Sequence, residues 1–341
     1  MKDMTLGEIA AKLNLSLSTV SRVINNKSNV GAQTRERVIR FLREQDCLQL
    51  ILSQGLLDHN EVVAVVIPDI SEDYFDYVVR GIEKHLWKEH IGMLLCDTME
   101  DVEKEAQFMN MLIGKNFTGI ILATVDKNEK QLAGYLQSGI NLVFFDNLPN
   151  INLTFNSVLT DNVKAGMLAV NHLLNLGHRC IGFISGKQEE TTGFERLVGY
   201  RRALELRKIE AAESLIAYGD FKEASGYQGM MKLLDANPAL SAVFVSSAKM
   251  TYGALKALND RGLRVPEDIA LVGFDIHDKT GLIRPGITSI MQSEEHIGQL
   301  CVELLRRSKQ ERGLGIKSQN QRIQLEPQLV IRGSCGAPLN H

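Results

Sequence analysis

The stretch SLSTVSRVINN, residues 16–26, decides how the first part of this 341-residue chain folds. It holds four hydroxyl side chains, three β-branched apolar residues, one arginine and two asparagines. At the spacing of a helix, Val20, Val23 and Ile24 fall on one side, where they can pack on a neighbouring helix. The hydroxyls and Arg22 fall on the other side. The stretch therefore predicts a short helix that buries aliphatic side chains and presents polar ones.

The polar side of this helix has a composition that suits a polyanion. It carries Leu17, Ser18, Ser21, Arg22 and Asn25 and no acidic group, which would repel phosphate. Hydroxyls suit phosphate oxygens, and a guanidinium suits the O6/N7 edge of guanine in the major groove of DNA. For an isolated helix, an ordinary solvated face is an equal alternative, so the neighbouring sequence must decide between the two interpretations.

The residues on either side of this stretch predict two further helices. Thr5 can cap a helix, and Glu8 three residues later completes a capping box. Ser16 can cap the central helix, and a third helix is expected to begin at Ala32 or Thr34. Three short helices with a tight turn between the first two are typical of a helix-turn-helix domain.

Charge separates this head from the rest of the chain. Residues 1–46 hold eight Lys/Arg and five Asp/Glu, a net charge of +3, which leaves −6 for residues 47–341 because the whole chain carries −3. A basic head on an acidic body favours a local contact with a polyanion. The head is therefore expected to bind double-stranded DNA.

The remaining composition predicts a soluble, cytoplasmic protein. The five cysteines are scattered without a CxxC pair, which is typical of reduced thiols. The N-terminus lacks an apolar signal region, and no apolar run approaches the ~20 residues that span a membrane. We therefore expect no membrane contact.

From residue 61 onward, unbroken apolar runs alternate with helical periodicity. Such runs predict strands buried on both faces, and their alternation with helices predicts parallel sheets. Two series of this kind predict an α/β core of two doubly wound parallel-sheet subdomains, with a ligand between them at the carboxyl ends of strands. The expected strands are residues 62–68, 92–97, 119–125, 141–146, 180–186, 242–247, 268–275 and 287–290, and the segment RIQLEPQLVIRGS (322–334) closes the chain.

These patterns also predict the domain boundaries. The head spans residues 1–46, a hinge or linker spans 47–60, and the core spans 61–341. Within the core, the first subdomain is expected to comprise about 61–160 plus 292–321, and the second about 161–291 plus 322–341.

Longer motifs carry a family resemblance over nearly the whole chain. They are TLGEIAAKLNLSLSTVSRVINNKSNVGAQTRERV (5–38), with the specific core STVSRVIN, then VIPDIS (66–71), YFDYVVRGIE (74–83), TDNVKAGMLAVNHLLNLGHRCIGFISG (160–186), ERLVGYRRAL (195–204), RVPEDIALVGFD (264–275) and LVIRGS (329–334). Together they resemble the lactose-repressor (LacI/GalR) family of transcriptional regulators. The resemblance implies a periplasmic-binding-protein-like core, a homodimer, a pseudo-palindromic operator and a small effector bound between the subdomains.

The resemblance assigns roles to residues of the head. It implies that Leu17, Ser18 and Arg22 read bases, and we expect Arg22 to make the sharpest base contact because the other two are small. The residues that it places against phosphates are Thr5, Ser16, Thr19, Ser21, Asn25 and Thr34.

The linker departs from the family pattern. The resemblance implies a hinge helix in the minor groove, with Leu56 as the wedge that opens a base step. This chain has Gln49-Leu50 where the family usually has Pro-Asn, and Ser53-Gln54 where it has Ala-Arg. The segment is also unusually apolar. Either two such hinges pair through their leucines on DNA, or the segment packs on the core, and the sequence leaves both open.

For the effector, the resemblance points to seven side chains. Aromatic faces can stack on a sugar or base ring, and Arg and Asp can hold hydroxyls through charged hydrogen bonds. Core packing is the alternative for the phenylalanines, and a plain salt bridge is the alternative for the Arg–Asp pair. The seven residues are Tyr74, Phe75, Asp146, Arg196, Phe221, Asp275 and Gln292, with Asn147 as a further residue of the rim.

One departure bears on the identity of the effector. Many members carry Asn-Asp where this chain has Ser247-Ala248, so a carboxylate that often grips sugar hydroxyls is missing. A sugar remains possible on this pattern, and a sugar phosphate or a nucleoside becomes more plausible.

Motifs for catalysis, cofactors or metals are missing. GFISGKQ (182–188) is not a phosphate loop, because only three residues separate its glycines and Gln follows the lysine. His172 and His178 lack partners at metal-ligand spacing. The alternatives are a secreted binding protein, which would need a signal and no head, and an enzyme on this architecture, which would need a catalytic motif. We therefore expect a ligand-responsive repressor that is not an enzyme and has no cofactor.

Overall fold

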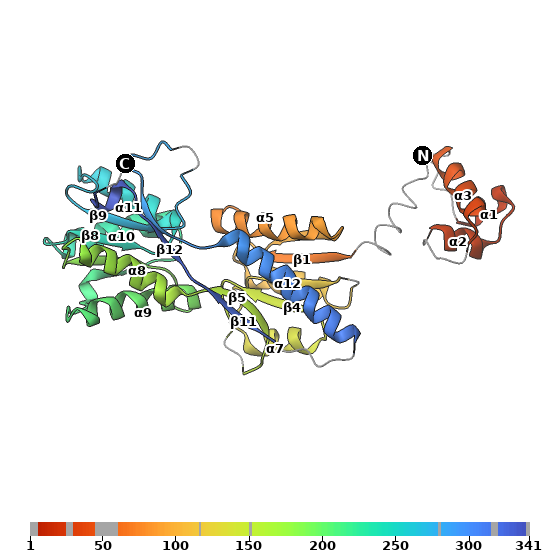
Figure 1. Cartoon of the computed structure of the whole chain (residues 1–341), viewed down its shortest axis with the longest axis horizontal. Coiled ribbons are helices and arrows are strands. Elements are labelled where there is room, and N and C mark those ends of the chain that lie inside the picture. The colour runs from red at the N-terminus through yellow and green to blue at the C-terminus, as the bar shows by residue number, and fades with distance from the viewer. Residues whose placement is uncertain are drawn as a thin grey trace.

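The computed structural model describes residues 6–24, 30–44, 61–115, 117–149, 152–278, 281–314 and 320–338. These residues form three helices near the N-terminus and two six-stranded sheets flanked by helices (Figure 1). Thr5, Asn25, Leu56 and the linker 47–60 lie outside the described residues. What the sequence implies about them therefore stays a prediction.

The head is a three-helix unit with its own small hydrophobic core. The aliphatic face predicted for the second helix is buried there, with Val20 fully covered and Val23 almost so. The backbone N–H of Thr19 donates to Oγ of Ser16 at 3.1 Å, which confirms Ser16 as the cap of that helix. The helices are α1 (Leu6–Leu13), α2 (Leu17–Ile24) and α3 (Ala32–Glu44). The core consists of Ile9, Ala10, Leu13, Val20, Val23, Val38 and Leu42.

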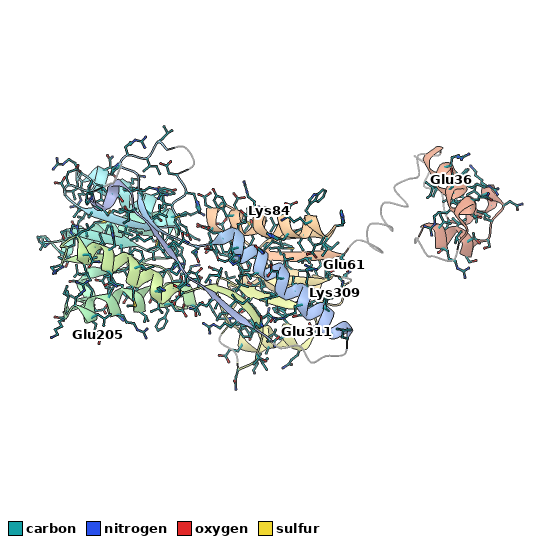
Figure 2. All side chains as sticks on the ribbon, viewed as in Figure 1. Glu36, Glu61, Lys84, Glu205, Lys309 and Glu311 are labelled. Atoms are coloured by element: carbon teal, nitrogen blue, oxygen red, sulfur yellow. The ribbon has the colours of Figure 1, made fainter. Side chains whose placement is uncertain are left out.

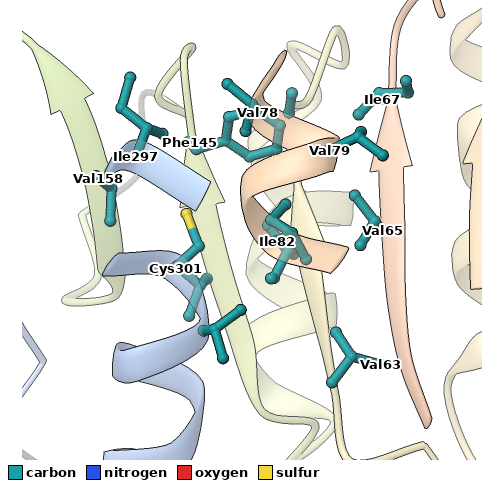
Figure 3. Packing of buried hydrophobic residues seen from close by; sticks show 14 of the residues in the cluster. Val63, Val65, Ile67, Val78, Val79, Ile82, Phe145, Val158, Ile297 and Cys301 are labelled. Carbon is teal, nitrogen blue, oxygen red and sulfur yellow. The ribbon is translucent and has the colours of Figure 1, made fainter. Parts of the chain in front are cut away.

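The first subdomain is built on a parallel sheet in the order β11-β5-β4-β3-β1-β2. Helices α5 and α12 cover one face, where Ile82 lies toward Val65 and Cys301 toward Val158 (Figure 3). Helices α6 and α7 cover the other face. The elements are β1 (Val62–Ile67), α5 (Asp73–Lys88), β2 (Gly92–Asp97), α6 (Val102–Leu112), β3 (Gly119–Leu122), α7 (Glu129–Gln137), β4 (Leu142–Phe145), β5 (Asn156–Thr160), α12 (Glu294–Gly313) and β11 (Arg322–Leu325).

The second subdomain repeats this plan in the order β12-β10-β9-β8-β6-β7, in which only β12 runs antiparallel to its neighbour. Helices α8 and α9 cover one face, and α10 and α11 cover the other. The elements are α8 (Asn162–Asn175), β6 (Ile181–Ser185), α9 (Thr191–Leu206), β7 (Ile216–Tyr218), α10 (Glu223–Ala236), β8 (Ala242–Val245), α11 (Ala248–Asp260), β9 (Ala270–Phe274), β10 (Thr288–Met291) and β12 (Gln328–Val330). Short 3-10 turns span Glu213–Leu215 and Gly333–Cys335.

The chain passes between the subdomains after β5, after β10, and again between β11 and β12, which Figure 1 shows in dark blue. Because β11 pairs with β5, residues 322–325 belong to the first sheet. The expected boundary, which gave 322–341 to the second subdomain, was wrong at this point. The sequence pattern suggested one closing element, but Pro327 has no backbone N–H to donate to a ladder and separates two short strands.

The expected strands all form, with ends that differ by a few residues. The sequence pattern did not predict β5 or β7. Just before β1, Glu61 pairs with Lys309 of α12, and both side chains are labelled in Figure 2. This ion pair ties the start of the core to the last long helix of the first subdomain.

Candidate functional site

A cleft between the subdomains is lined by side chains that follow the carboxyl ends of strands in both sheets. Its empty space measures about 720 Å³, including the part that opens to solvent, which suits a small organic molecule. The first subdomain contributes Pro68, Asp69, Glu72, Tyr74, Phe75, Glu100, Val125, Asp146 and Asn147. The second contributes Lys187, Glu190, Thr192, Arg196, Phe221, Ser247, Ala248, Phe274 and Asp275, and Gln292 lies at a crossing. All seven residues expected from the sequence thus lie in one cleft, and their contact with an effector stays a prediction.

Tyr74 and Phe75 lie in the first turn of α5, and both are buried. Their ring centroids are 5.1 Å apart, and the Phe75 ring lies 6.1 Å from that of Phe145 in β4, both in edge-on geometry. Phe75 therefore belongs to the hydrophobic core as well as to the wall of the cleft. Burial, with help from nearby carboxylates, raises the pKa of Tyr74 well above its usual value. Its hydroxyl stays neutral and hydrogen-bonds to Asp146.

Asp146 directly follows β4 and has a left-handed φ of 65°, which is uncommon outside glycine. Burial raises the pKa of its carboxyl to about 7, while Arg196 opposes the shift and Glu190 adds to it. The acid and the carboxylate are therefore both populated near neutral pH. Asp146 can either donate or accept a hydrogen bond in the cleft.

Arg196, from α9, is held from three sides. Its Nε donates to Oδ1 of Asn162 at 2.8 Å, its Nη1 donates to the carbonyl of Ser246 at 2.6 Å, and the guanidinium lies 3.6 Å from the ring centroid of Phe274. Burial lowers its pKa, and Asp275 and Asp146 oppose that shift. Within the described residues, Arg196 makes no direct ion pair with Asp275, so the salt-bridge alternative is wrong.

Asp275 directly follows β9, is buried, and has a left-handed φ of 52°. Gln292 donates to both carboxylate oxygens, through its backbone N–H at 3.1 Å and its Nε2 at 2.7 Å. Burial raises the pKa of Asp275, and the charge of Glu294 adds to this. Gln292 thus orients Asp275 from the crossing between the subdomains.

Phe221, in the loop after β7, is half-buried and has a φ of 69°. Its ring packs on Gly186, where an added Cβ would lie 2.0 Å from ring carbons. Phe221 also packs against the core of the second subdomain. The same side chain therefore contributes both to core packing and to the wall of the cleft.

Three side chains, Lys249, Lys187 and Asn147, form contacts across the cleft that the sequence did not predict. Lys249 contacts Asp69 and Glu72, Lys187 contacts Glu100, and Asn147 accepts hydrogen bonds from the start of α9. Lys187 is the lysine of GFISGKQ, which sequence analysis rejected as a phosphate loop. The lysine of this motif was the only local sign of these contacts in the sequence, because the two partners in each contact lie in different subdomains.

The polar face of α2 is turned outward, as the sequence predicts. Leu17 is 56% exposed, and Ser18 and Arg22 are exposed beside it. The hydroxyl of Ser16 lies 2.9 Å from that of Ser18 and 2.7 Å from that of Thr19, at the N-terminus of the helix. Ser21 and Thr34 are half-buried, the latter near the start of α3. These are the positions at which the resemblance implies DNA contacts, and that role stays a prediction.

Comparison with known proteins identifies the family. Residues 5–46 match the model for bacterial regulatory proteins of the lacI family, and residues 170–335 match a periplasmic binding protein-like domain. Catabolite control protein A of Priestia megaterium is 31% identical over 305 residues, which cover 89% of this chain and 92% of that protein. The chain belongs to the lacI family of bacterial regulatory proteins.

Two further likenesses cover almost the whole LacI-family chain. The transcriptional repressor PurR of Haemophilus influenzae (strain PittEE) is 29% identical over 97% of this chain and 98% of its own. The transcriptional regulator CelR, solved in complex with cellobiose, superimposes with a TM-score of 0.73 at 30% identity, over 97% of this chain and 99% of its own. This LacI-family protein is therefore a transcriptional regulator of the repressor type and not an enzyme.

No helix in the described ranges is long and apolar enough to cross a membrane. In the same part of the chain, no three His, Cys, Asp or Glu side chains gather in a way that could hold a metal ion.

Proposed function

We propose that this LacI-family regulator binds a pseudo-palindromic operator as a homodimer and releases or tightens its hold when a small effector fills the cleft. The observation that carries the proposal is the outward ridge of Leu17, Ser18 and Arg22 on α2. A helix of this length fits the major groove, and no acidic side chain stands in its first turn.

The contacts within the head support a division of labour on DNA. The hydroxyls of Ser16, Ser18 and Thr19 cluster at the N-terminus of α2, where the helix dipole attracts phosphate. Arg22 lies in the last turn, farther along the exposed face. We infer that one set of side chains fixes the register on the DNA backbone, while Arg22, Ser18 and Leu17 read bases. The first set is Ser16, Thr19, Ser21, Asn25, Thr5 and Thr34.

The charges of the cleft favour an uncharged effector. Its two lysines, Lys187 and the nearby Lys249, already contact carboxylates, and Arg196 faces Asp146 and Asp275. Among the described residues that line the cleft, a phosphate would therefore find no unpaired ammonium group. A neutral polyol, with hydroxyls for the aspartates and a ring for Phe221 or Tyr74, fits better. The supporting likeness is CelR, whose structure contains cellobiose, so we propose a sugar or a nucleoside rather than a sugar phosphate.

The first subdomain also presents a surface for a second copy of the chain. Strand β2 is an edge of its sheet, and bare apolar edges invite pairing. The exposed apolar residues on β2, the following turn and α6 are Leu94, Leu95, Met99, Val102 and Met111, which we call the β2–α6 surface. A homodimer through this surface would bring two heads to the two halves of an operator.

Two experiments test the proposal. Selection of DNA by the full-length protein should enrich an inverted repeat, and the log of its affinity should fall steeply with the log of salt concentration because several phosphates are contacted. A flat salt response, or selected DNA without an inverted repeat, would contradict it. For the effector, a thermal-shift screen of sugars, nucleosides and sugar phosphates should find a stabilising ligand. At ~100 Kd such a ligand adds ~2.7 kcal/mol, and a response restricted to sugar phosphates would overturn the choice of an uncharged effector.

A further inference from the structure

Lys249 stands where a cation is electrostatically disfavoured. It is the second residue of α11, and the N-terminus of a helix carries a partial positive charge. Burial alone would lower the pKa of its ammonium group, but contacts with Asp69 and Glu72 together outweigh burial and raise it. The position of this lysine therefore depends on partners outside its own helix.

Those partners all lie on the opposite subdomain, in the loop between β1 and α5. The Nζ of Lys249 lies 2.9 Å from Oδ2 of Asp69, 3.0 Å from Oε1 of Glu72 and 2.8 Å from Oγ of Ser71. The backbone N–H of Ser71 also donates to Oδ1 of Asp69 at 2.8 Å, which fixes the loop. We call these four residues the Lys249 clasp.

The two carboxylates contribute differently. Hydrogen bonds from Ser71 and Lys249 outweigh the effect of burial and lower the pKa of Asp69, so it stays ionised. Burial raises the pKa of Glu72 although Lys249 opposes the shift. Asp69 is therefore the stronger partner. All three charged side chains are between 20% and 30% exposed, so solvent screens the clasp less than it screens a surface pair.

We propose that Lys249 is a positioning residue that holds the two walls of the effector cleft together without contacting the effector's ring site. It acts through Asp69 and Glu72, which line the cleft, and it favours the closed arrangement before any ligand enters. The inference concerns the cleft that the proposed function assigns to an effector. Its test needs no effector and no DNA, so its failure is separable from failure of that function.

Two backbone amides report directly on closure. The N–H of Leu148 in the first subdomain donates to Oγ1 of Thr191 at 3.2 Å, and the N–H of Thr192 in the second donates to Oδ1 of Asn147 at 3.3 Å. Both hydrogen bonds cross the cleft, so opening frees both amides. The amides of Ala123 and Ser246 bond within their own sheets and serve as references for global stability.

The experiment is residue-resolved hydrogen exchange on the full-length protein and its variants. Lys249→Met should raise exchange at Leu148 and Thr192 by about three- to tenfold relative to the reference amides, while Lys249→Arg should restore protection. Lys84→Met is the matched control, because Lys84 pairs with Glu295 inside the first subdomain. It should leave both amides unchanged.

Salt and charge reversal complete the test. In ~1 M salt, where the Debye length is ~3 Å, exchange in the wild type should rise part of the way toward that of Lys249→Met, because the clasp is only partly exposed. At low salt, exchange in Lys249→Glu should exceed that of Lys249→Met. Unchanged exchange at Leu148 and Thr192 in both Met and Glu variants would overturn the proposal. So would a rise shared equally by Ala123 and Ser246, because it would reflect general destabilisation.

Discussion

Arg22 combines two properties that suit a base-reading side chain. Its side chain is exposed, and Val20 and Val23 on the opposite side of α2 are buried, which fixes the direction in which the exposed side of the helix points. A guanidinium so placed can form a bidentate contact with guanine, which discriminates between bases as well as adding affinity. The hydroxyls beside it can bind phosphates of any sequence.

Arg22→Ala should therefore cost about 1–3 kcal/mol on the matched operator and relax the choice at one base pair. Affinities for matched and single-mismatch duplexes, measured at one salt concentration, provide the check. Arg40→Ala is a matched control, since Arg40 is exposed on α3 and pairs with Glu36. If Arg22→Ala weakens matched and mismatched duplexes equally, Arg22 contacts only phosphate.

Asp146 gives the cleft a dependence on pH. Its folded-state pKa of about 7 lies above the ordinary value of 3.8, so the folded protein binds this proton more tightly than the unfolded chain. The stabilising effect is complete below pH ~4 and is lost as pH rises through about 7. Between pH 5 and 8, the wild type should therefore lose more stability than Asp146→Asn, by an amount on the order of 1–2 kcal/mol because the carboxyl is partly exposed.

Urea unfolding of both proteins at pH 5 and pH 8 measures this difference. Asp275, Glu190 and Arg196 are present in both, so their contributions largely cancel. Parallel loss of stability in the wild type and Asp146→Asn would show that the carboxyl ionises normally.

Helix α9 owes its position to close contact with α8. A Cβ built on Gly199 would lie 2.2 Å from the carbonyl oxygen of Val163 and 2.9 Å from the Cα of Gly166. Neither of these is a flexible side-chain end, so the helices would have to separate. The same helix carries Arg196, whose carbonyl lies against Gly166. The spacing of two helices thus sets the position of a cleft residue.

Gly199→Ala should destabilise the protein by about 1–3 kcal/mol through overpacking. Gly134→Ala is an informative control, because Gly134 lies within α7 and an added Cβ meets nothing within 4 Å. That change should stabilise by up to ~1 kcal/mol, since alanine favours the helix. Denaturant unfolding should show the two variants moving in opposite directions, and a neutral Gly199→Ala would contradict the close-packing argument.

The sequence predicted those strands whose own residues are almost all apolar, because such a composition indicates burial. The runs VVAVVI and GIIL have no polar interruption, and both form buried strands. Strand β5 was missed because its sequence, NSVLT, is half polar although every residue is buried. Asn156 is tolerated there because its side chain bonds to Ser308 at 2.9 Å and to the N–H of Gln321 at 2.8 Å. Such distant partners leave no trace in a local pattern.

The same limit applies to the two-subdomain assembly. The resemblance identified cleft residues at strand ends, and the structure gathers them. It gave no role to Lys249, whose contacts with Asp69 and Ser71 join residues about 180 positions apart. The sequence pattern also assigned β11 to the wrong sheet, because such a pattern shows that a strand forms but not which partner it takes. Contacts between subdomains depend on the tertiary arrangement, so local periodicity cannot predict them.

The proposed dimer would link this core to operator binding. The β2–α6 surface exposes apolar side chains on an edge strand, where Leu94 and Leu95 are each 36% exposed. A carboxylate at the centre of a paired interface would be desolvated without a partner, which costs several kcal/mol. Leu94→Asp/Leu95→Asp should therefore yield a monomer by analytical ultracentrifugation, with the subdomain fold preserved because neither side chain is buried.

The consequence for DNA follows from geometry. A monomer contacts one half of an inverted repeat and loses the gain in effective concentration that a second, tethered head provides, which is about 10²–10⁴-fold. The double variant should thus bind the full operator no better than a single half-site, whereas the wild type should prefer the full operator strongly. Glu205→Asp, an exposed change on α9 labelled in Figure 2, controls for substitution as such. A double variant that stays dimeric would place the interface on another face, and one that is monomeric yet keeps full operator affinity would separate dimerisation from DNA recognition.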